Sequence, residues 1–209
     1  MAVRAEDDTR EALLDAAESL FAAEGLDNVS LAAITRLADQ RNGGAIHYYF
    51  GGRDGLLAAI LDRHEAILDD IRMTSLIELR RTGDVTIEAL LRVAVESLAG
   101  RLDSASGRSF LAIQRDRVIE SGAAWNFRSA TMQLIAAETE ALLSDRGFDD
   151  AEQAERFRLV TQLVIHRLAD RSREETLKTT TPRTLVVETL VSAATSILTA
   201  GRRQNATRV

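Results

Sequence analysis

Three neighbouring side chains, Gln40, Arg41 and Asn42, are of the types that proteins use to contact DNA. Arginine pairs well with O6 and N7 of guanine, asparagine pairs well with adenine, and all three can donate to phosphates. Two glycines follow at positions 43 and 44, where the missing side chains would let the backbone approach a duplex closely. Residues 40–44 therefore have the chemistry of a nucleic-acid contact surface.

Two short helices around a tight turn would position these side chains. Ser30 is a candidate N-cap for the first helix, which is expected to end at Ala38. A polar turn follows at 39–44, and the second helix is expected at roughly 43–49, ending in an aromatic run. A helix-turn-helix presents one helix to the major groove in this way while the other braces it.

The composition of the whole chain predicts an all-α protein. Apolar residues make up 45% of its 209 residues, and a single proline leaves long windows free of helix breakers. We expect about nine helices, near 8–24, 30–38, 43–49, 54–81, 86–101, 107–121, 123–145, 150–172 and 182–201. The predicted domains are an N-terminal helix-turn-helix domain at 1–53 and a C-terminal helical domain at 54–209, with the helix at 54–81 linking them.

Several classes of protein are disfavoured by what the sequence lacks. The chain has no cysteine, which rules out disulfides and thiolate chemistry and suits a reducing compartment. The acidic start MAVRAEDD does not look like a secretory signal, and no window approaches the ~18 uncharged apolar residues of a membrane helix. We therefore expect a cytoplasmic protein without a membrane partner.

Catalysis finds little support in the residue pattern. The three histidines, His47, His64 and His166, show no close His–Glu–His spacing, and no phosphate-loop pattern is present. We predict no enzyme activity, no metal site and no cofactor. A helical-bundle enzyme is the less favoured alternative, and a dimeric helical scaffold that has lost DNA binding is another.

Residues 9–63 resemble the N-terminal domain of TetR-type transcriptional regulators. The matching runs are TREALLDAAESLFAAEGL, VSLAAITRLA and AIHYYFGGRDGLLAAIL. The turn is similar to a variant of the family with the pattern A-G-Q-R-N, matched here by Ala38, Gln40, Arg41 and Asn42. Two positions depart from the family: Asp39 stands where glycine is common, and Gly52 stands where a serine-type cap is frequent.

The resemblance implies a sequence-specific regulator, most simply a repressor that a small-molecule effector releases from a palindromic operator. By resemblance, His47 and Tyr48 contact phosphates or groove edges, and Arg53 clamps a phosphate. Tyr48 could instead pack beside Tyr49, and Arg41 could pair with an acid in the turn. The predicted DNA-contacting residues are Ser30, Arg36, Gln40, Arg41, Asn42, Gly43, Gly44, Ala45, His47, Tyr48 and Arg53.

Charge argues against a general DNA binder. Residues 1–65 hold six arginines and twelve acids, a net charge of −6 that equals the formal charge of the whole chain. Within 36–53, however, three arginines face the single acid Asp39. We therefore expect few phosphate contacts and a reliance on base contacts and on dimerisation.

Broad apolar faces on the last two helices favour a homodimer. The resemblance implies that these helices pair with their copies as a four-helix bundle. Such a dimer would hold two recognition helices about 34 Å apart, or a multiple of that distance. The faces could also be ordinary core within one chain. The candidate interface residues are Phe157, Val160, Val164, Leu168, Val186, Leu190, Val191, Ala194 and Ile197.

A largely apolar effector would bind among the helices spanning 86–172. Aromatic residues and a few polar anchors there could line a cavity, although most aromatics at helical spacing are core. His166 shares a helix face with Leu159 and Leu163, which favours a packing histidine with satisfied hydrogen bonds over a ligand contact. The candidates are Phe110, Gln114, Trp125, Phe127, Met132, Phe148 and His166.

Overall fold

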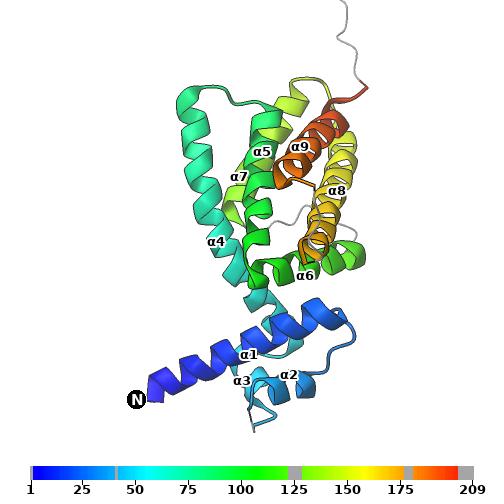
Figure 1. The fold of residues 1–209 in the computed structure, drawn as a ribbon. Coiled ribbons are helices and arrows are strands. Elements are labelled where there is room, and N and C mark those ends of the chain that lie inside the picture. Colours follow the sequence, from blue (N-terminus) through cyan, green and yellow to red (C-terminus); the bar gives the residue numbers. More distant parts are fainter. Residues whose placement is uncertain (1, 41, 122–128, 177–180, 202–209) are drawn as a thin grey trace, which may run out of the picture.

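A small head of three helices lies below a larger helical body, and one long helix runs from the head into the body (Figure 1). The computed structural model describes residues 2–40, 42–121, 129–176 and 181–201, and within these ranges the chain forms nine α-helices and no strand, as predicted. In chain order they are α1 (Ala2–Glu24), α2 (Leu31–Leu37), α3 (Ala45–Phe50), α4 (Arg53–Thr82), α5 (Ile87–Gly100), α6 (Ala105–Ser121), α7 (Ala130–Ser144), α8 (Asp150–Thr176) and α9 (Arg183–Thr199), with the short 3₁₀ helix η1 (Arg101–Asp103) before α6.

Two helix starts differ from the prediction. Helix α1 begins at Ala2 rather than near Asp8, because the run AVRAEDD contains no helix breaker. Helix α7 begins at Ala130 rather than near 123, because Ser129 has an extended backbone and its Oγ accepts a hydrogen bond from the Met132 amide at 3.0 Å. Residues 122–128 lie outside the described part of the chain.

The head and the body share one hydrophobic core. Its fully buried members include Phe21 and Ile46 in the head and Phe110 and Leu168 in the body. Helix α6 lies across the lower end of the body and packs against both α1 and α8 (Figure 1). The head is therefore held both by its continuation into α4 and by the contact of α1 with α6.

The predicted dimer residues are mostly interior to the single chain. Apart from Ile197, which is half-buried, every candidate on α8 and α9 is less than a tenth exposed. Helices α8 and α9 turn these apolar faces toward each other and toward α5 and α6. The structure thus corrects the prediction: the broad apolar faces stabilise the body, and side chains such as Leu159 and Leu185 stay exposed instead.

Candidate nucleic-acid interface

Helix α2 starts at the cap that the sequence predicts. The Ser30 backbone is extended, and its Oγ accepts a hydrogen bond from the Ala33 amide at 3.1 Å. Ile34 is fully buried, whereas Ser30 and Arg36 are exposed. The Ser30 hydroxyl proton therefore stays free to point outward, where it can donate to a phosphate.

The turn between α2 and α3 is held by the polar side chains that were expected to read DNA. The Gln40 side-chain amide donates to the Ala38 carbonyl at 3.1 Å, and Asn42 Oδ1 accepts from the Gly44 amide at 2.9 Å. Asp39 has a φ of 52°, the left-handed conformation that the departure from glycine led us to suspect. Gln40 and Asn42 thus spend part of their hydrogen-bonding capacity inside the protein, and Arg41 lies outside the described residues.

Helix α3 divides its side chains between the core and the surface. Ala45 and Ile46 are buried, which corrects the expectation that the Ala45 side chain reaches DNA. His47 is exposed, and Tyr48 is 75% exposed although its ring packs edge-on against Tyr49 at 4.9 Å. Both alternatives for Tyr48 are therefore met in part: it touches Tyr49 and still presents most of its ring and its hydroxyl to solvent.

Two glycines let α4 start directly beside the end of α3. Gly52 has a φ of 121°, which glycine tolerates far better than the serine frequent in related sequences. A Cβ at Gly55 would lie 1.7 Å from the carbonyl oxygen of Phe50, so only glycine allows this approach. The recognition helix is thus braced from behind by α4.

Arg53 is directed into the protein rather than toward a phosphate. Its Nη1 donates to the Val29 carbonyl at 2.6 Å, and its guanidinium lies 4.9 Å from the centre of the Phe21 ring. Its Nη2 is buried and has no hydrogen-bond partner among the described residues. This geometry does not support the phosphate clamp that resemblance implied, because Arg53 fixes the residues that precede the Ser30 cap.

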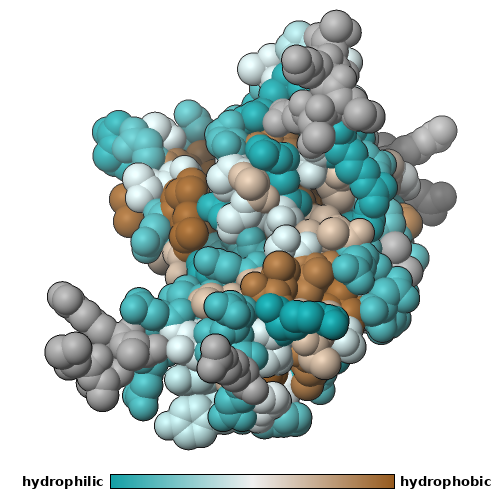
Figure 2. Space-filling view, turned by 60° about the horizontal axis from the view of Figure 1, so that its bottom comes forward, coloured by the Kyte–Doolittle hydropathy of each residue, from teal (hydrophilic) through white to brown (hydrophobic). Residues whose placement is uncertain are grey.

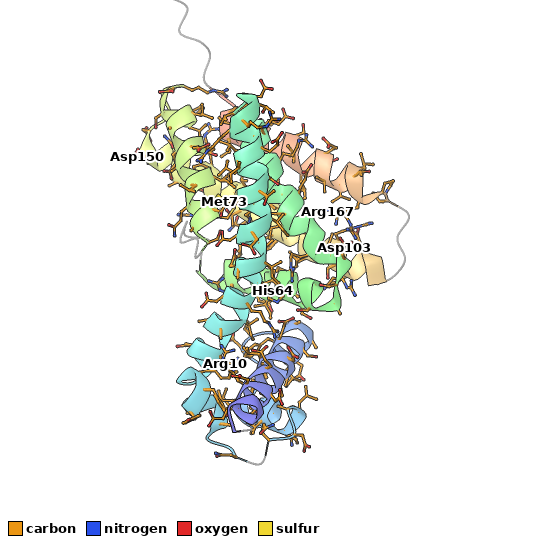
Figure 3. The ribbon with its side chains drawn as sticks, turned by 90° about the vertical axis from the view of Figure 1, so that its left-hand side faces the viewer. Arg10, His64, Met73, Asp103, Asp150 and Arg167 are labelled. Atoms are coloured by element: carbon orange, nitrogen blue, oxygen red, sulfur yellow. The ribbon has the colours of Figure 1, made fainter. Side chains whose placement is uncertain are left out.

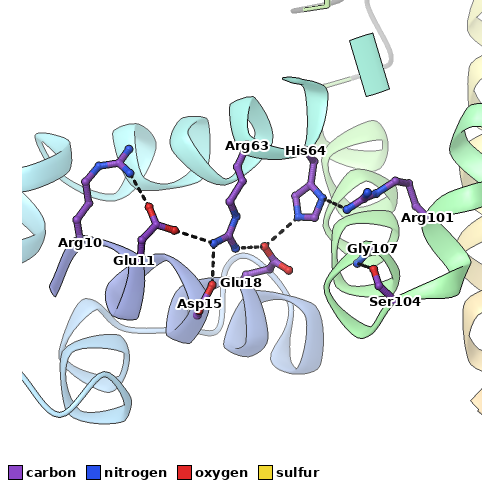
Figure 4. A network of polar contacts seen from close by, with 9 residues as sticks. All are labelled: Arg10, Glu11, Asp15, Glu18, Arg63, His64, Arg101, Ser104 and Gly107. Atoms are coloured by element: carbon purple, nitrogen blue, oxygen red, sulfur yellow. Dashed lines mark hydrogen bonds and ion pairs between the residues drawn. The ribbon is translucent and has the colours of Figure 1, made fainter. Parts of the chain in front are cut away.

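Part of the acidic surplus of the head lies at its junction with the body, away from α2 and α3. Figure 4 shows Glu11, Asp15 and Glu18 on α1 facing Arg63 and His64 on α4. Asp15 accepts from Arg63 Nη1 at 2.7 Å, and Glu18 is bonded to both Arg63 and His64. The net charge of the head therefore says little about the side with α2 and α3, because these acids lie on the side of α1 that faces α4.

Glu18 and His64 are the residues that reasoning from sequence missed. Burial alone would raise the pKa of Glu18, but hydrogen bonds from His64, Ser106 and Arg63 outweigh it and lower the pKa from 4.5 to about 2. A histidine inside the apolar repeat of the long helix was the available signal. Its partner could not be read from the sequence, because Glu18 lies 46 residues earlier.

The surface of this end of the molecule is mainly hydrophilic. Figure 2 brings the lower end of Figure 1 forward, and hydrophilic residues cover most of it while hydrophobic residues gather in separate patches. Arg36 is exposed, and it forms no ion pair with any residue that the structure describes. The described reading surface is thus small: Ser30, Arg36, Gly43, Gly44, His47 and Tyr48, with the free edges of Gln40 and Asn42.

The candidate effector residues do not gather in one place. Phe110 is fully buried in the main core, whereas Met132 packs against a second small cluster of Leu76, Leu90 and Ile135. Trp125 and Phe127 lie outside the described residues. A shallow, open hollow of about 410 Å³ between α7 and α8 is lined by none of the candidates; its lining is Ala137, Glu140, Ala141, Ser144, Asp150, Gln153 and Ala154.

His166 departs from the expected packing histidine. The residue is half-buried, and its Nε2 is enclosed without a hydrogen-bond partner among the described residues. A buried ring nitrogen without a hydrogen-bond partner costs free energy. His166 is therefore not the packing histidine with satisfied hydrogen bonds that the sequence favoured. His166 remains a candidate anchor for a polar group of an effector.

The body also contains a buried charge on α4. Arg72 is 2% exposed; its Nε donates to Ser97 Oγ at 3.0 Å, and its Nη1 donates to Glu65 at 3.0 Å and to Ser129 Oγ at 3.3 Å. Burial lowers the pKa of Arg72, and the attraction of Glu65 and Asp69 opposes that shift. One guanidinium therefore ties α4 to α5 and to the cap of α7.

Searches for metal sites and membrane spans add two negative findings. Among the described residues, no group of three or more His, Asp or Glu side chains could hold a metal ion. Within the same ranges, every helix is too short or too polar to cross a membrane.

Residues 13–60 match the family model described as "Bacterial regulatory proteins, tetR family". A solved structure described as "Molecular basis for control of antibiotic production by a bacterial hormones" is similar with a TM-score of 0.51 and 17% identity, over 89% of this chain and 96% of that one. A TetR-family regulator from Streptomyces coelicolor A3 aligns with a TM-score of 0.47 and 20% identity, over 92% of this chain and 96% of its own. No curated protein matches significantly.

Proposed function

We propose that this chain, whose residues 13–60 match the family model of tetR regulatory proteins, is a repressor that binds a palindromic operator. The observation that carries the proposal is the exposure of His47 and Tyr48 on a short helix whose other face, Ala45 and Ile46, is buried. A helix anchored on one side and polar on the other is suited to a major groove. Ser30 and Arg36 on α2 supply backbone contacts beside it.

Dimerisation through α8 and α9 is the second part of the proposal. The exposed line of α9 carries Leu185, Thr189, Ser192 and Ser196, mostly small side chains that allow two helices to approach closely. On α8, Leu159 is 46% exposed. Two copies related by a two-fold axis would bury these side chains against each other and present two reading heads.

The third part is release by a small, largely apolar effector that binds in the body. His166 and Gln114 are the described polar candidates to orient the effector. Phe110 would move when the effector binds, and it would pass that movement to His64, on which its ring stacks. Effector binding would shift the body between two arrangements. Helix α4 would carry that shift to the head and change the separation of the two recognition helices.

Selection of binding sites from a random DNA pool tests the first part. We expect a palindromic site, and Tyr48→Ala should weaken binding to it by about 1–3 kcal/mol per half-site. Ile77→Ala is the matched control, since Ile77 is 57% exposed on α4 far from the reading surface and should leave affinity unchanged. Failure to enrich any site would favour the scaffold that has lost DNA binding.

A further inference from the structure

His64 lies at the point where the head meets the body, and it joins two charged residues of different elements (Figures 3 and 4). It is 1% exposed. Its Nε2 lies 2.9 Å from the Glu18 carboxylate of α1, and its Nδ1 lies 2.7 Å from Arg101 Nη2 of η1. The ring thus connects an acid of the head with a cation of the body.

The two contacts fix the position of the proton on the ring. A guanidinium can only donate hydrogen bonds, so Nδ1 must accept from Arg101. Nε2 then carries the proton and donates it to Glu18. The three residues form an ordered chain of donors, Arg101 to His64 to Glu18, in which each bond favours the next. We refer to these three residues as the relay.

Helix α6 of the body holds the relay in place. The Phe110 ring stacks on His64 with a centroid distance of 4.5 Å, and one turn later the Gln114 amide lies 3.5 Å from the carboxylate of Glu65. Phe110 and Gln114 of α6 therefore contact the consecutive residues His64 and Glu65 of α4. Both residues of α6 are candidates to bind an effector. A movement of α6 along α4 would pull on His64 directly.

We propose that the relay of Arg101, His64 and Glu18 is the contact through which the arrangement of the body sets the orientation of the reading head. This inference rests on the proposed function, and it names the positioning residues of that regulation. The neighbouring ion pair between Asp15 and Arg63 does not share this role, because Asp15 is 71% exposed and water can replace its contact. Breaking the relay leaves the buried ring nitrogens of His64 without partners, so it favours two discrete arrangements over gradual slippage.

The natural absence of cysteine allows a direct test of head orientation. Cysteines introduced at the exposed positions Asp27 in the head and Asp84 at the far end of α4 accept a pair of nitroxide labels, and pulsed electron paramagnetic resonance measures the distance between them. Labelled protein is diluted with unlabelled protein so that each distance stays within one chain. The measurement needs neither DNA nor effector.

Glu18→Gln and Arg101→Met should each shift or broaden the distance distribution, by on the order of 2 Å or more. Asp15→Asn is the matched control on the same helix and should reproduce the wild-type distribution. Arg101→Met is the sharper variant, because it removes the hydrogen bond to His64 and leaves the bond between Arg63 and Glu18 in place. The proposal is overturned if both relay variants fold and keep the wild-type distribution.

The ring itself provides an independent readout. Long-range proton–nitrogen spectra should show the Nε2–H form of His64 in the wild type, and finding the proton on Nδ1 would contradict the ordered chain. Affinity for the selected operator should fall about tenfold or more in Glu18→Gln, within the usual range of coupling between sites, and by about twofold at most in Asp15→Asn. If no operator is found, the proposed function fails while the distance and tautomer measurements still decide the relay.

Discussion

Replacing Glu18 by glutamine should flatten the dependence of the chain's stability on pH in acid. In the folded chain the pKa of Glu18 is lowered from 4.5 to about 2, because bonds from His64, Ser106 and Arg63 outweigh the opposing effect of burial. The unfolded chain therefore binds the proton more tightly than the folded chain does. The free energy of unfolding that this carboxylate contributes is fully present above pH 4.5, its ordinary pKa. The contribution is lost as the pH falls from there toward about 2, the pKa in the folded chain.

The size of the effect follows from the shift. A pKa lowered by this amount corresponds to about 3 kcal/mol of folding free energy at neutral pH. Little of it should be lost to solvent screening, because the Glu18 side chain is only 5% exposed. The wild type and Glu18→Gln should therefore differ most at neutral pH and converge in acid.

Urea unfolding followed by circular dichroism over a series of pH values measures this difference, at one fixed protein concentration because the proposed dimer would add to stability. Asp15→Asn serves as the control, since it removes an exposed carboxylate bonded to the same Arg63. Two parallel curves, with the same loss of stability in wild type and Glu18→Gln, would refute the reasoning.

Substitutions at Asp39, Arg53 and Leu159 test other parts of the structure. Asp39→Gly and Asp39→Asn both remove a negative charge from the turn and should tighten DNA binding about two- to fivefold, but only glycine should also relieve the left-handed strain and add up to about 1 kcal/mol of stability in urea unfolding. Equal stability of the two variants would show that the turn carries no strain. Arg53→Met should lower stability by about 1–2 kcal/mol while leaving the log–log salt slope of DNA binding unchanged, because its guanidinium is bonded to Val29. A slope reduced by about 0.9 for each protomer would instead restore the phosphate clamp. Leu159→Glu should dissociate the dimer in light-scattering measurements, since each two-fold interface would lose two apolar contacts of about 1.5–3 kcal/mol, whereas Leu134→Glu, on an exposed position of α7, should not. A dimer that survives Leu159→Glu would place the interface elsewhere.

Local signals in the sequence were sufficient for most helices and for the cap and turn of the head. Ser30 was predicted as a cap from its residue type, and Asp39 was suspected of strain because glycine is common at that position. Both are properties of a few adjacent residues. The start of α7 was missed because its cap, Ser129, follows a run without a helix breaker, so that periodicity alone extended the helix too early.

Tertiary partners were beyond the reach of the sequence. The apolar stripes of α8 and α9 predict that those faces are buried, but they do not predict which surface covers them. In the structure, other helices of the same chain cover them. The inward turn of Arg53 onto Phe21 and Val29 has the same cause, since no spacing reveals which surface a flexible cation will find. Counting charges failed for a related reason, because the count does not show that Glu18 and its neighbours on α1 face α4 rather than the side with α2 and α3.

These corrections change what a single head can do on DNA. Gln40 and Asn42 are partly occupied in holding the turn, and Arg53 is occupied in holding the approach to α2, so Arg36 is the exposed cation of the described reading surface. The described residues of one head then neutralise few phosphates, and we expect one head alone to bind weakly at physiological salt. Useful affinity requires two heads at a fixed separation, because linking two weak contacts multiplies their strength only when both can engage together. A contact that sets head orientation, such as the one through His64, can therefore control binding without touching DNA.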